Sequence, residues 1–477
     1  MSRLRRPQPL GLSPTFGFGD RLGSATLGHL DAIWAHGNAI KPIFAQQSSR
    51  EMQRTGRSAT DVMKNASDAL RKATYQGVWS ADADHIRSHE EVNVAAGAKF
   101  VIYTIDPSDH VDLSIDSLSF EEVADKHAQS KGEFNWADRY IGRTISIEDG
   151  PLIELSEDSV KRTALKYGRA IAHAMRLAEQ VDGVMTKRGK QEYEIELSVN
   201  ESPRPTSLVE HYIIADQCLR SEMKLISLAL RYVGRFEKGI DFNGDFNELS
   251  RFLSNHASLA RHLGPYKLSM HSGSDKFSIY EMFARATRGM FHVKTAGTSY
   301  LEALRVVARY DCQLFRRIID TAREHFEEDR NSDMVSANLD SVSAPSQIND
   351  HHLIREYLDE DDGRQILHVT FGTVLSDLSL GQRIHELLQS HEETYRHLLA
   401  HHFGRHLAAL NRGLQPLGEA SSNGNHHENG EPTTNDQESQ NEHLVPTAES
   451  RQQQINQGNG NHQQQRLDIS RSIAKSK

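Results

Sequence analysis

The segment GVWSADADH, residues 77–85, starts as a short apolar strand and ends in three ionisable side chains. The same pattern, an aliphatic or β-branched run followed by polar residues, occurs eight times, and helical patterns separate most of the copies. Strand, polar loop and helix repeated eight times predict an α/β fold, the (β/α)8 or TIM-like barrel, whose chemistry lies at the carboxyl ends of the strands. The predicted strands cover residues 15–20, 77–85, 100–106, 192–201, 225–234, 266–276, 290–297 and 366–372.

The pattern divides the chain into a barrel, an insertion and a tail. Residues 1–417 are expected to form the catalytic barrel, with helices over most of 26–73 and a last helix at 381–410. Residues 107–158 are longer than an ordinary loop and contain a candidate strand at 144–147, so they are predicted to be a lid on the catalytic face. Residues 418–477 are rich in Asn, Gln, His and Gly and are predicted to be disordered. Further helices are predicted at 159–180, 247–262 and 300–327.

Composition excludes several classes of protein. No run approaches the roughly 18–20 apolar residues of a membrane span, and the net charge of −10 argues against general binding of nucleic acid. Residues 1–14 contain basic side chains with no apolar segment behind them, so a secretory signal is not expected. The only two cysteines, Cys218 and Cys312, fall in helical patterns. A disulfide framework is therefore excluded, and the cytoplasm is the expected compartment.

Asp82, Asp84 and His85 form the densest group of ionisable side chains at a predicted strand end. The two aspartates alternate onto one face of an extended segment. Two inward carboxylates beside a histidine suit a metal ion or the hydroxyl groups of a sugar. In the alternative interpretation, an aspartate caps the following helix by accepting backbone N–H bonds. This segment alone does not separate the two interpretations.

Three further histidines, His271, His292 and His368, lie in or just after predicted strands. A single histidine in an apolar strand is more often a hydrogen-bonded core residue than a ligand. Several on the strands of one barrel converge, and neutral imidazoles gathered in this way suit a divalent cation. The histidines of the last predicted helix have no regular spacing and are expected on the surface; they are His385, His391, His397, His401, His402 and His406.

Basic and acidic residues near the strand ends supply candidates for substrate contacts. Arg21, Lys276 and Lys294 are suited to bind an anion, although a loop lysine is more often solvated. A Schiff-base lysine is the other option, but the Ser, Thr and Gly neighbours give no sign of the desolvation that it needs. Glu196 and Glu201 end the fourth predicted strand, where a glutamate is either a general base or an ion-pair partner.

Long motifs stand at these positions in a fixed order. They are FGDRLG (18–23), ADADHI (81–86), FEKGID (236–241), YKL (266–268), HSGSDKFS (271–278), HVKTAGTSYLE (292–302) and HVTFG (368–372). From about residue 14 to 412 the chain resembles the tagaturonate/fructuronate epimerases. The resemblance implies a divalent-metal-dependent enzyme of hexuronate catabolism that interconverts D-tagaturonate and D-fructuronate. It also implies Asp-Glu after the fourth strand, where this chain has Asn200-Glu201.

The stereocentre inverted in that reaction is β to the ketone, so the carbonyl does not acidify its C–H in the usual way. A retro-aldol cleavage avoids this problem but needs a base on the β-hydroxyl and a Lewis acid. By strand-end position, the metal is assigned to His85, His271 and His368, and the acid/base pair to Asp84 and Glu201. Substrate contacts are assigned to Arg21, Asp82, Asp275, Lys276 and Lys294.

Other functions on the same barrel remain open at the level of sequence. They are a metal-dependent aldolase or ketose isomerase acting on a related sugar acid, and a sugar-acid-binding protein without turnover. A transient oxidation is not favoured, because no nucleotide-cofactor motif is present. The expected cofactor is a divalent cation, with Zn, Mn, Ni and Co not distinguished. The expected partner is a small-molecule hexuronate, and a homo-oligomer is left open.

Overall fold

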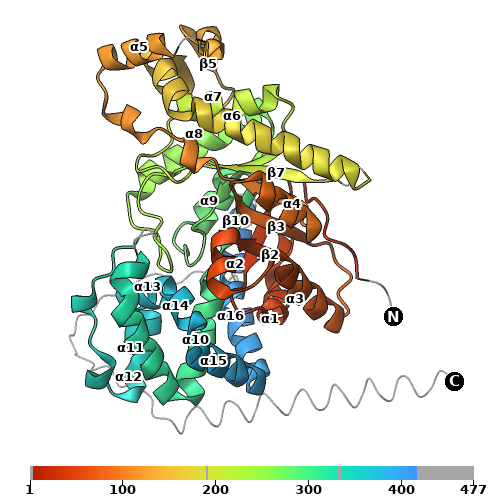
Figure 1. Ribbon diagram of the computed structural model, residues 1–477, viewed down its shortest axis with the longest axis vertical. Helices are drawn as coiled ribbons and strands as arrows, with labels where there is room; N and C mark the ends of the chain where they lie inside the picture. The colour runs from red at the N-terminus through yellow and green to blue at the C-terminus, as the bar shows by residue number, and fades with distance from the viewer. Residues whose placement is uncertain (1–3, 131, 190–191, 331–334, 416–477) are drawn as a thin grey trace, which may run out of the picture. The chain divides into compact units, whose positions relative to one another are not determined.

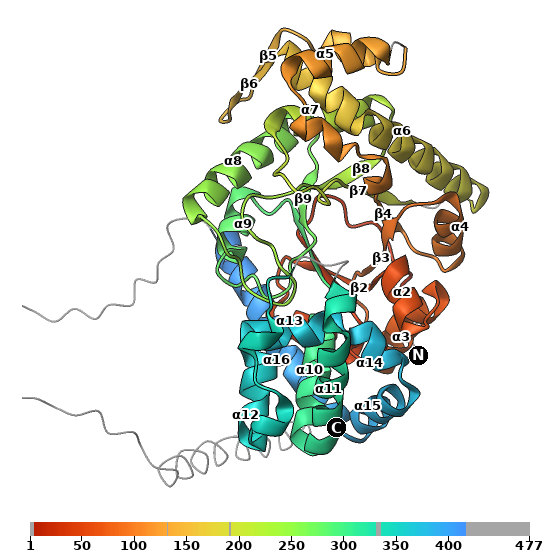
Figure 2. The same cartoon turned by 60° about the vertical axis from the view of Figure 1, so that its left-hand side comes forward.

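The computed structural model describes residues 4–130, 132–189, 192–330 and 335–415. Eight parallel strands close into a barrel in the order β1-β10-β9-β8-β7-β4-β3-β2, and helices surround it (Figure 1, Figure 2). The predicted barrel is therefore confirmed. The strands are β1 (Thr15–Gly19), β2 (Lys41–Ser48), β3 (Ser80–Ile86), β4 (Ile102–Ile105), β7 (Glu194–Ser198), β8 (Leu225–Ala229), β9 (Lys267–Met270) and β10 (Phe291–Thr295).

One predicted strand is wrong and one real strand was missed. Residues 366–372 run through two helices, α13 (Asp361–Val369) and α14 (Phe371–Ser376). The missing strand is β2, in a stretch predicted to be mainly helical. A short apolar run buried on all sides reads the same in a helix as in a strand, which explains the first error. The strand β2 was not predicted because Gln46 and Gln47 are polar, although both side chains are buried.

Polar side chains line the interior of the barrel. His292 of β10 and Lys267 of β9 both contact Thr15 at the start of β1. His292 Nδ1 lies 2.8 Å from Thr15 Oγ1, and the Lys267 ammonium donates to the same oxygen at 3.3 Å. Burial lowers the pKa of His292 to about 3, so its imidazole is neutral. Residues two apart on a strand point to the same side, so Lys294 also points into the barrel, where it is buried.

The predicted helices are present, with two of them divided. The segments 159–180 and 247–262 lie in α6 (Glu157–Lys187) and α8 (Phe246–Leu263). The segment 300–327 is α10 (Thr298–Tyr310) and α11 (Cys312–Asp329), and 381–410 is α15 (Leu378–Ser390) and α16 (Glu392–Leu414). The Asp311 carboxylate starts α11 by accepting the Leu314 N–H at 3.0 Å. Further α-helices are α1 (Thr26–His36), α2 (Ser49–Thr55), α3 (Ala59–Lys72), α7 (Leu208–Arg220) and α9 (Tyr280–Ala286).

The stretch between β4 and α6 lies beside α6 (Figure 1), and its apolar residues form a small core with residues of α6, α7 and α8. It contains α5 (Phe120–Gln129) and an antiparallel pair, β5 (Arg143–Ser146) and β6 (Leu152–Leu155). The predicted extra strand is thus present as β5. Buried Lys166 of α6 anchors the stretch through ion pairs of 3.0 Å with Asp116 and Glu210. The role of residues 107–158 as a lid stays a prediction.

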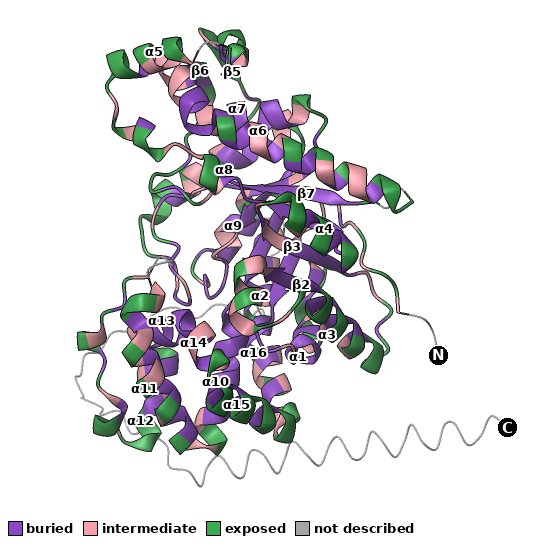
Figure 3. Ribbon diagram, viewed as in Figure 1, coloured by how far each residue is buried: buried purple, intermediate pink, exposed green. Residues whose placement is uncertain are grey.

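Helix α16 packs against α1 and α9, and Phe403 places its ring 5.2 Å from that of Phe18 on β1. Figure 3 shows the buried strands and the exposed outer faces of the helices. His402 and His406 face inward and are buried, so their predicted surface location is wrong, whereas His401 is exposed as predicted. The i, i+4 spacing that puts both on one face of the helix was the overlooked signal.

No helix among the described residues combines the length and apolar character needed to cross a bilayer. The tail predicted to be disordered, 418–477, lies outside the described residues.

Candidate functional site

Four charged side chains from three strands meet inside the carboxyl end of the barrel. The Lys294 ammonium lies 2.7 Å from an oxygen of Asp82, 2.7 Å from Asp84 and 2.9 Å from Glu196. The Thr104 hydroxyl of β4 lies 2.5 Å from the same nitrogen. The structure therefore brings together Asp82, Asp84 and Lys294, three of the predicted site residues, and adds Glu196 to them.

The cluster contains one ammonium and three carboxyl groups, so negative charge is in excess. The pKa values of the three carboxyls therefore shift in different directions. Burial, with help from the neighbouring carboxylates, raises the pKa of Asp82 to about 6. Burial acts in the same direction on Asp84 and Glu196, but Lys294 and the nearby histidines outweigh it and hold the pKa of both carboxyls below the usual range. Burial opposes the charge of Lys294, yet the three carboxylates raise its pKa. Lys294 is therefore a permanent cation, and Asp82 is the carboxyl that can hold a proton near neutral pH.

His85 and His271 lie beside this cluster, with their ring centroids 5.0 Å apart. His85 Nδ1 is 2.9 Å from Asp106 Oδ2, and its Nε2 is 3.8 Å from Asp84 Oδ1. Burial disfavours a charge on His85, but Asp84 and Asp106 outweigh it and raise its pKa to about 9. His271 Nε2 is 2.6 Å from Glu196, whereas its buried Nδ1 has no hydrogen-bond partner among the described residues. Burial and then Lys294 lower the pKa of His271, which favours the neutral imidazole.

His368 reaches the same region from α13 instead of from a strand. It lines a small pocket together with Glu237, Lys238, Gly239, His271, Ser272, Ser274 and Ala296. The His368 ring packs directly against the backbone at two glycines, which have no side chain to separate them from it. A Cβ at Gly297 would lie 2.0 Å from His368 Nε2, and one at Gly239 would lie 3.2 Å from its Cδ2. Glycine at these two positions is what allows the imidazole to occupy the pocket wall.

Glu201 lies at the edge of the site and is 45% exposed. Its carboxylate is 3.1 Å from Arg87 Nη2, which is also 2.6 Å from Asp106. Asp106 is fully buried and holds His85 as well, so it orients both a cation and an imidazole. Arg87 and Asp106 were missed as site residues, although Asp106 is the last residue of the predicted strand 100–106 and this position was the available signal.

Arg21 is occupied by protein partners. Its Nε donates to Glu51 at 2.9 Å, its Nη1 donates to the His368 carbonyl at 3.0 Å, and its guanidinium stacks 3.6 Å above the Phe371 ring. The side chain is only 5% exposed. Arg21 therefore links the backbone of His368 to the loop that follows β1.

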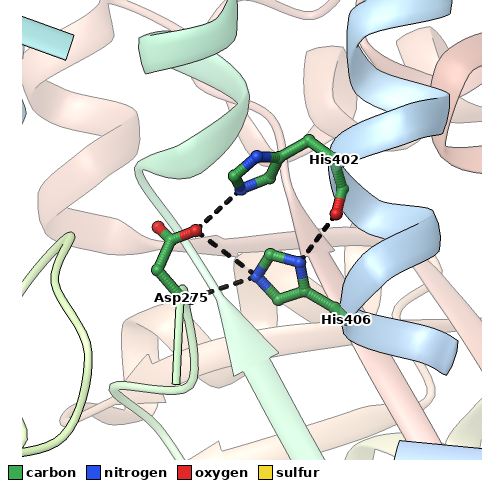
Figure 4. Close-up of side chains that lie close together, drawn as sticks. All are labelled: Asp275, His402 and His406. Atoms are coloured by element: carbon green, nitrogen blue, oxygen red, sulfur yellow. Dashed lines mark hydrogen bonds and ion pairs between the residues drawn. The ribbon is translucent and has the colours of Figure 1, made fainter. Parts of the chain in front are cut away.

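Lys276 and Asp275 also lie outside the lining of the pocket. The Lys276 ammonium donates to the backbone carbonyls of Glu237 and Ser274 at 2.9 and 3.0 Å, and to that of Ile240. Burial lowers the pKa of Lys276 to about 8. Asp275 lies in a separate buried cluster with two histidines of α16 (Figure 4).

The donors at the barrel mouth fit a divalent cation. The unpartnered Nδ1 of neutral His271 offers a lone pair, and a cation would replace the proton that the carboxylates hold on His85. Three donor atoms within 4.8 Å of one another come from His85, Asp106 and Glu201, and among the described residues no such group includes His271 or His368. Imidazole and carboxylate are the donors that zinc and similar metals take in catalytic sites.

Similarity to known proteins agrees with this geometry. The model of the tagaturonate epimerase family matches residues 3–410. The chain belongs to the tagaturonate epimerase family. It is 40% identical over 405 residues to the tagaturonate/fructuronate epimerase of Thermotoga maritima, with 85% of this chain and 82% of that relative covered. As a member of the tagaturonate epimerase family, the protein is an enzyme of the isomerase class.

Solved structures of this family share the fold. The native crystal structure of the fructuronate-tagaturonate epimerase UxaE from Cohnella laeviribosi matches with a TM-score of 0.80 and 34% identity, over 85% of this chain and 83% of that one. A complex of the same enzyme with one glycerol molecule gives the same values.

Proposed function

We propose that this epimerase interconverts D-tagaturonate and D-fructuronate by inverting the hydroxyl-bearing carbon β to the ketone. The observation that carries the proposal is the buried cluster of Lys294 with Asp82, Asp84 and Glu196. It places one fixed cation and several proton acceptors at the barrel mouth. The relative that is 40% identical is named for both uronates.

We assign a divalent cation to His85, His271 and His368. The unpartnered His271 Nδ1 and the shared pocket of His271 and His368 support this assignment. When bound, such a cation would stabilise the negative charge that develops on the ketone oxygen. Asp106 would orient His85 through its Nδ1, and Glu196 would orient His271 through its Nε2.

Proton transfer is assigned to Asp84, with Glu201 as the second group. The low pKa of Asp84 keeps it ionised, so its oxygen can accept the proton of the β-hydroxyl. Loss of that proton allows the bond between the α and β carbons to break, which gives an aldehyde and an enediolate. Rotation of the aldehyde and renewed bond formation invert the centre, and the proton returns to the new hydroxyl. Lys294 balances the negative charge throughout, and Asp82 can store a proton near neutral pH.

Proton NMR of the metal-loaded protein in D2O tests this proposal. Tagaturonate and fructuronate, supplied separately, should reach the same final ratio, and the β carbon should retain its hydrogen because the C–H bond never breaks. Deuterium at that carbon would refute the retro-aldol route. Accumulation of an aldehyde without the epimer would indicate an aldolase, and binding without product would indicate a protein without turnover.

Substitution of the proposed base separates its role from a general loss of charge. Asp84→Asn should lower kcat by about 10²–10⁴-fold, the usual contribution of a positioned acid or base. Asp68→Asn on the exposed face of α3 is the matched control and should leave kcat unchanged, because Asp68 pairs with the exposed side chains of Lys64 and Arg71. Equal activity of the two variants would show that Asp84 is not the base.

A further inference from the structure

The Asp275 carboxylate is the centre of a buried cluster that joins the loop after β9 to α16 (Figure 4) and, through Arg364, to α13. Asp275 lies on the loop after β9, four residues beyond His271, with a positive φ of 60°. Its Oδ1 is 2.7 Å from His402 Nε2, and its backbone N–H donates to His406 Nε2 at 3.0 Å. Its Oδ2 is 3.0 Å from Arg364 Nη2 of α13. A left-handed backbone at a non-glycine residue is held by such contacts.

Hydrogen bonds satisfy the histidines of this cluster without a bound ion. His406 Nδ1 donates to the His402 carbonyl at 2.9 Å, so its Nε2 is the acceptor of the Asp275 N–H. His402 donates from Nε2 to Asp275, and its Nδ1 lies 3.5 Å from Glu302 Oε1. Although three donor atoms are close enough to hold a cation, His402 Nε2 carries the proton that it donates to Asp275, and the His406 Nε2 lone pair accepts the Asp275 N–H. The cluster therefore works as a set of internal contacts.

Arg364 extends these contacts to the walls of the pocket. Besides Asp275, its guanidinium donates to the Gly239 carbonyl at 2.9 Å and to the Leu358 carbonyl at 2.6 Å. Gly239 belongs to the pocket lining, and His368 follows Arg364 by one helical turn on α13. Neither Asp275 nor Arg364 lines the pocket. The buried ion pair between Asp275 and Arg364 thus joins the loop of His271, the loop of Gly239 and the helix of His368 from outside the pocket lining.

We propose that Asp275, with Arg364 and His402, is a positioning residue that fixes the separation of His271 and His368 across the pocket. The inference rests on the proposed function, because it takes these two histidines as the working groups of the epimerase. It assigns to α16 a part in the site, since His402 and His406 hold the loop that carries His271. Asp275 then acts on the substrate only through other residues.

The test compares four variants with the wild-type enzyme on tagaturonate. Asp275→Asn keeps the shape of the side chain but removes its charge, Arg364→Gln removes the other half of the ion pair, and the double variant tests their coupling. Tyr266→Phe is the matched control, because it removes a buried hydrogen bond to His211 at the opposite end of β9. The measurements are kcat, KM, urea unfolding, and the Co²⁺ content and visible spectrum of Co²⁺-loaded protein after gel filtration.

Each single variant should lower kcat or Co²⁺ retention about 10–100-fold, the usual effect of losing a residue that orients a ligand. KM should change less than about threefold, and the double variant should be no worse than the single ones because the pair acts as a unit. A changed Co²⁺ spectrum would show altered ligand geometry, which lost stability alone does not produce. His402→Gln, which keeps a donor, is the milder variant if Asp275→Asn does not fold, and a smaller effect in the same direction is expected.

Variants that match Tyr266→Phe in kcat, Co²⁺ content and spectrum would overturn the inference while the wild type remains an active epimerase. Loss of a second equivalent of Co²⁺ from His402→Gln would also overturn it, because the cluster would then be a metal site. A wild-type protein without turnover would refute the proposed function itself, and the inference with it.

Discussion

Gly297→Ala moves one proposed ligand without removing it. The new Cβ would lie 2.0 Å from His368 Nε2, 2.4 Å from Cδ2 and 2.6 Å from Cε1. Ordinary contacts begin near 3.4 Å, so the ring must recede by about 1.4 Å. The backbone itself accepts alanine, because φ is −81° and ψ is −12° at this position. The strain therefore falls on the imidazole.

A displacement of that size has two expected consequences. The free energy of unfolding should fall by about 1–3 kcal/mol, the usual cost of overpacking a core. The ratio kcat/KM should fall about 10²-fold, since an error of about 1 Å in a catalytic constellation has that effect. The assays are urea unfolding, NMR of the two uronates, and elemental analysis of the metal retained per chain.

The control is Gly183→Ala in α6, where a Cβ meets nothing within 4 Å. It should stabilise the helix by up to about 1 kcal/mol and leave kcat/KM unchanged. Gly297→Ala combined with His368→Ala should be no less active than His368→Ala alone. A Gly297→Ala protein that is destabilised yet keeps wild-type kcat/KM and metal content would refute the placement of His368 in the site.

Four further predictions address the metal, the buried charges and the position at which the chain departs from the expected motif. Chelation should abolish turnover and Mn, Zn, Ni or Co should restore it; a fully active preparation found metal-free by elemental analysis would contradict this. Lys276→Met should lower the free energy of unfolding by about 1–3 kcal/mol for each backbone carbonyl left unpaired, with a smaller effect on KM, and a borohydride-trapped adduct on Lys276 would oppose a structural role. Between its ordinary pKa and about 6, Asp82 binds more protons in the folded than in the unfolded protein. The stability that this bound proton contributes is therefore lost as the pH rises through 6. Wild-type stability should therefore fall relative to Asp82→Asn by roughly 2 kcal/mol between pH 4 and 7, as measured by urea unfolding, and parallel pH profiles would disprove the shift. Asn200→Asp should change turnover or the preference between uronates and neutral ketoses, and unchanged kinetics would show that Asn200 has only the structural role suggested by its 2.6 Å bond from Ser198.

The sequence predicted much of the candidate cluster because strand-end position is a local property. In a parallel barrel all carboxyl ends share one face, so polar residues after separate strands converge whatever their distance along the chain. Asp82, Asp84, His85, His271 and Lys294 were located in this way, and the structure places them together. Their placement required only the alternation of strands and helices, which the chain itself specifies.

The tertiary structure alone decided which charged residues face the pocket. Lys276 and Lys294 follow equivalent patterns, yet one donates to backbone carbonyls and the other meets three carboxylates. The difference lies in the backbone of distant loops, which no local pattern encodes. Likewise, the sequence could not show that His402 is buried against Asp275, because the packing of α16 on the barrel depends on the whole fold.

The same distinction explains the missed strand. The sequence predicted seven of the eight barrel strands, since the periodicity of side chains records which faces are buried. It did not determine that β2 is one of them, because a buried glutamine of β2 has its hydrogen-bond partner on another strand. Gln46, for example, donates to the carbonyl of Thr295 at 3.0 Å. Burial of polar groups is decided by hydrogen bonds between distant segments, and only the folded chain brings those segments together.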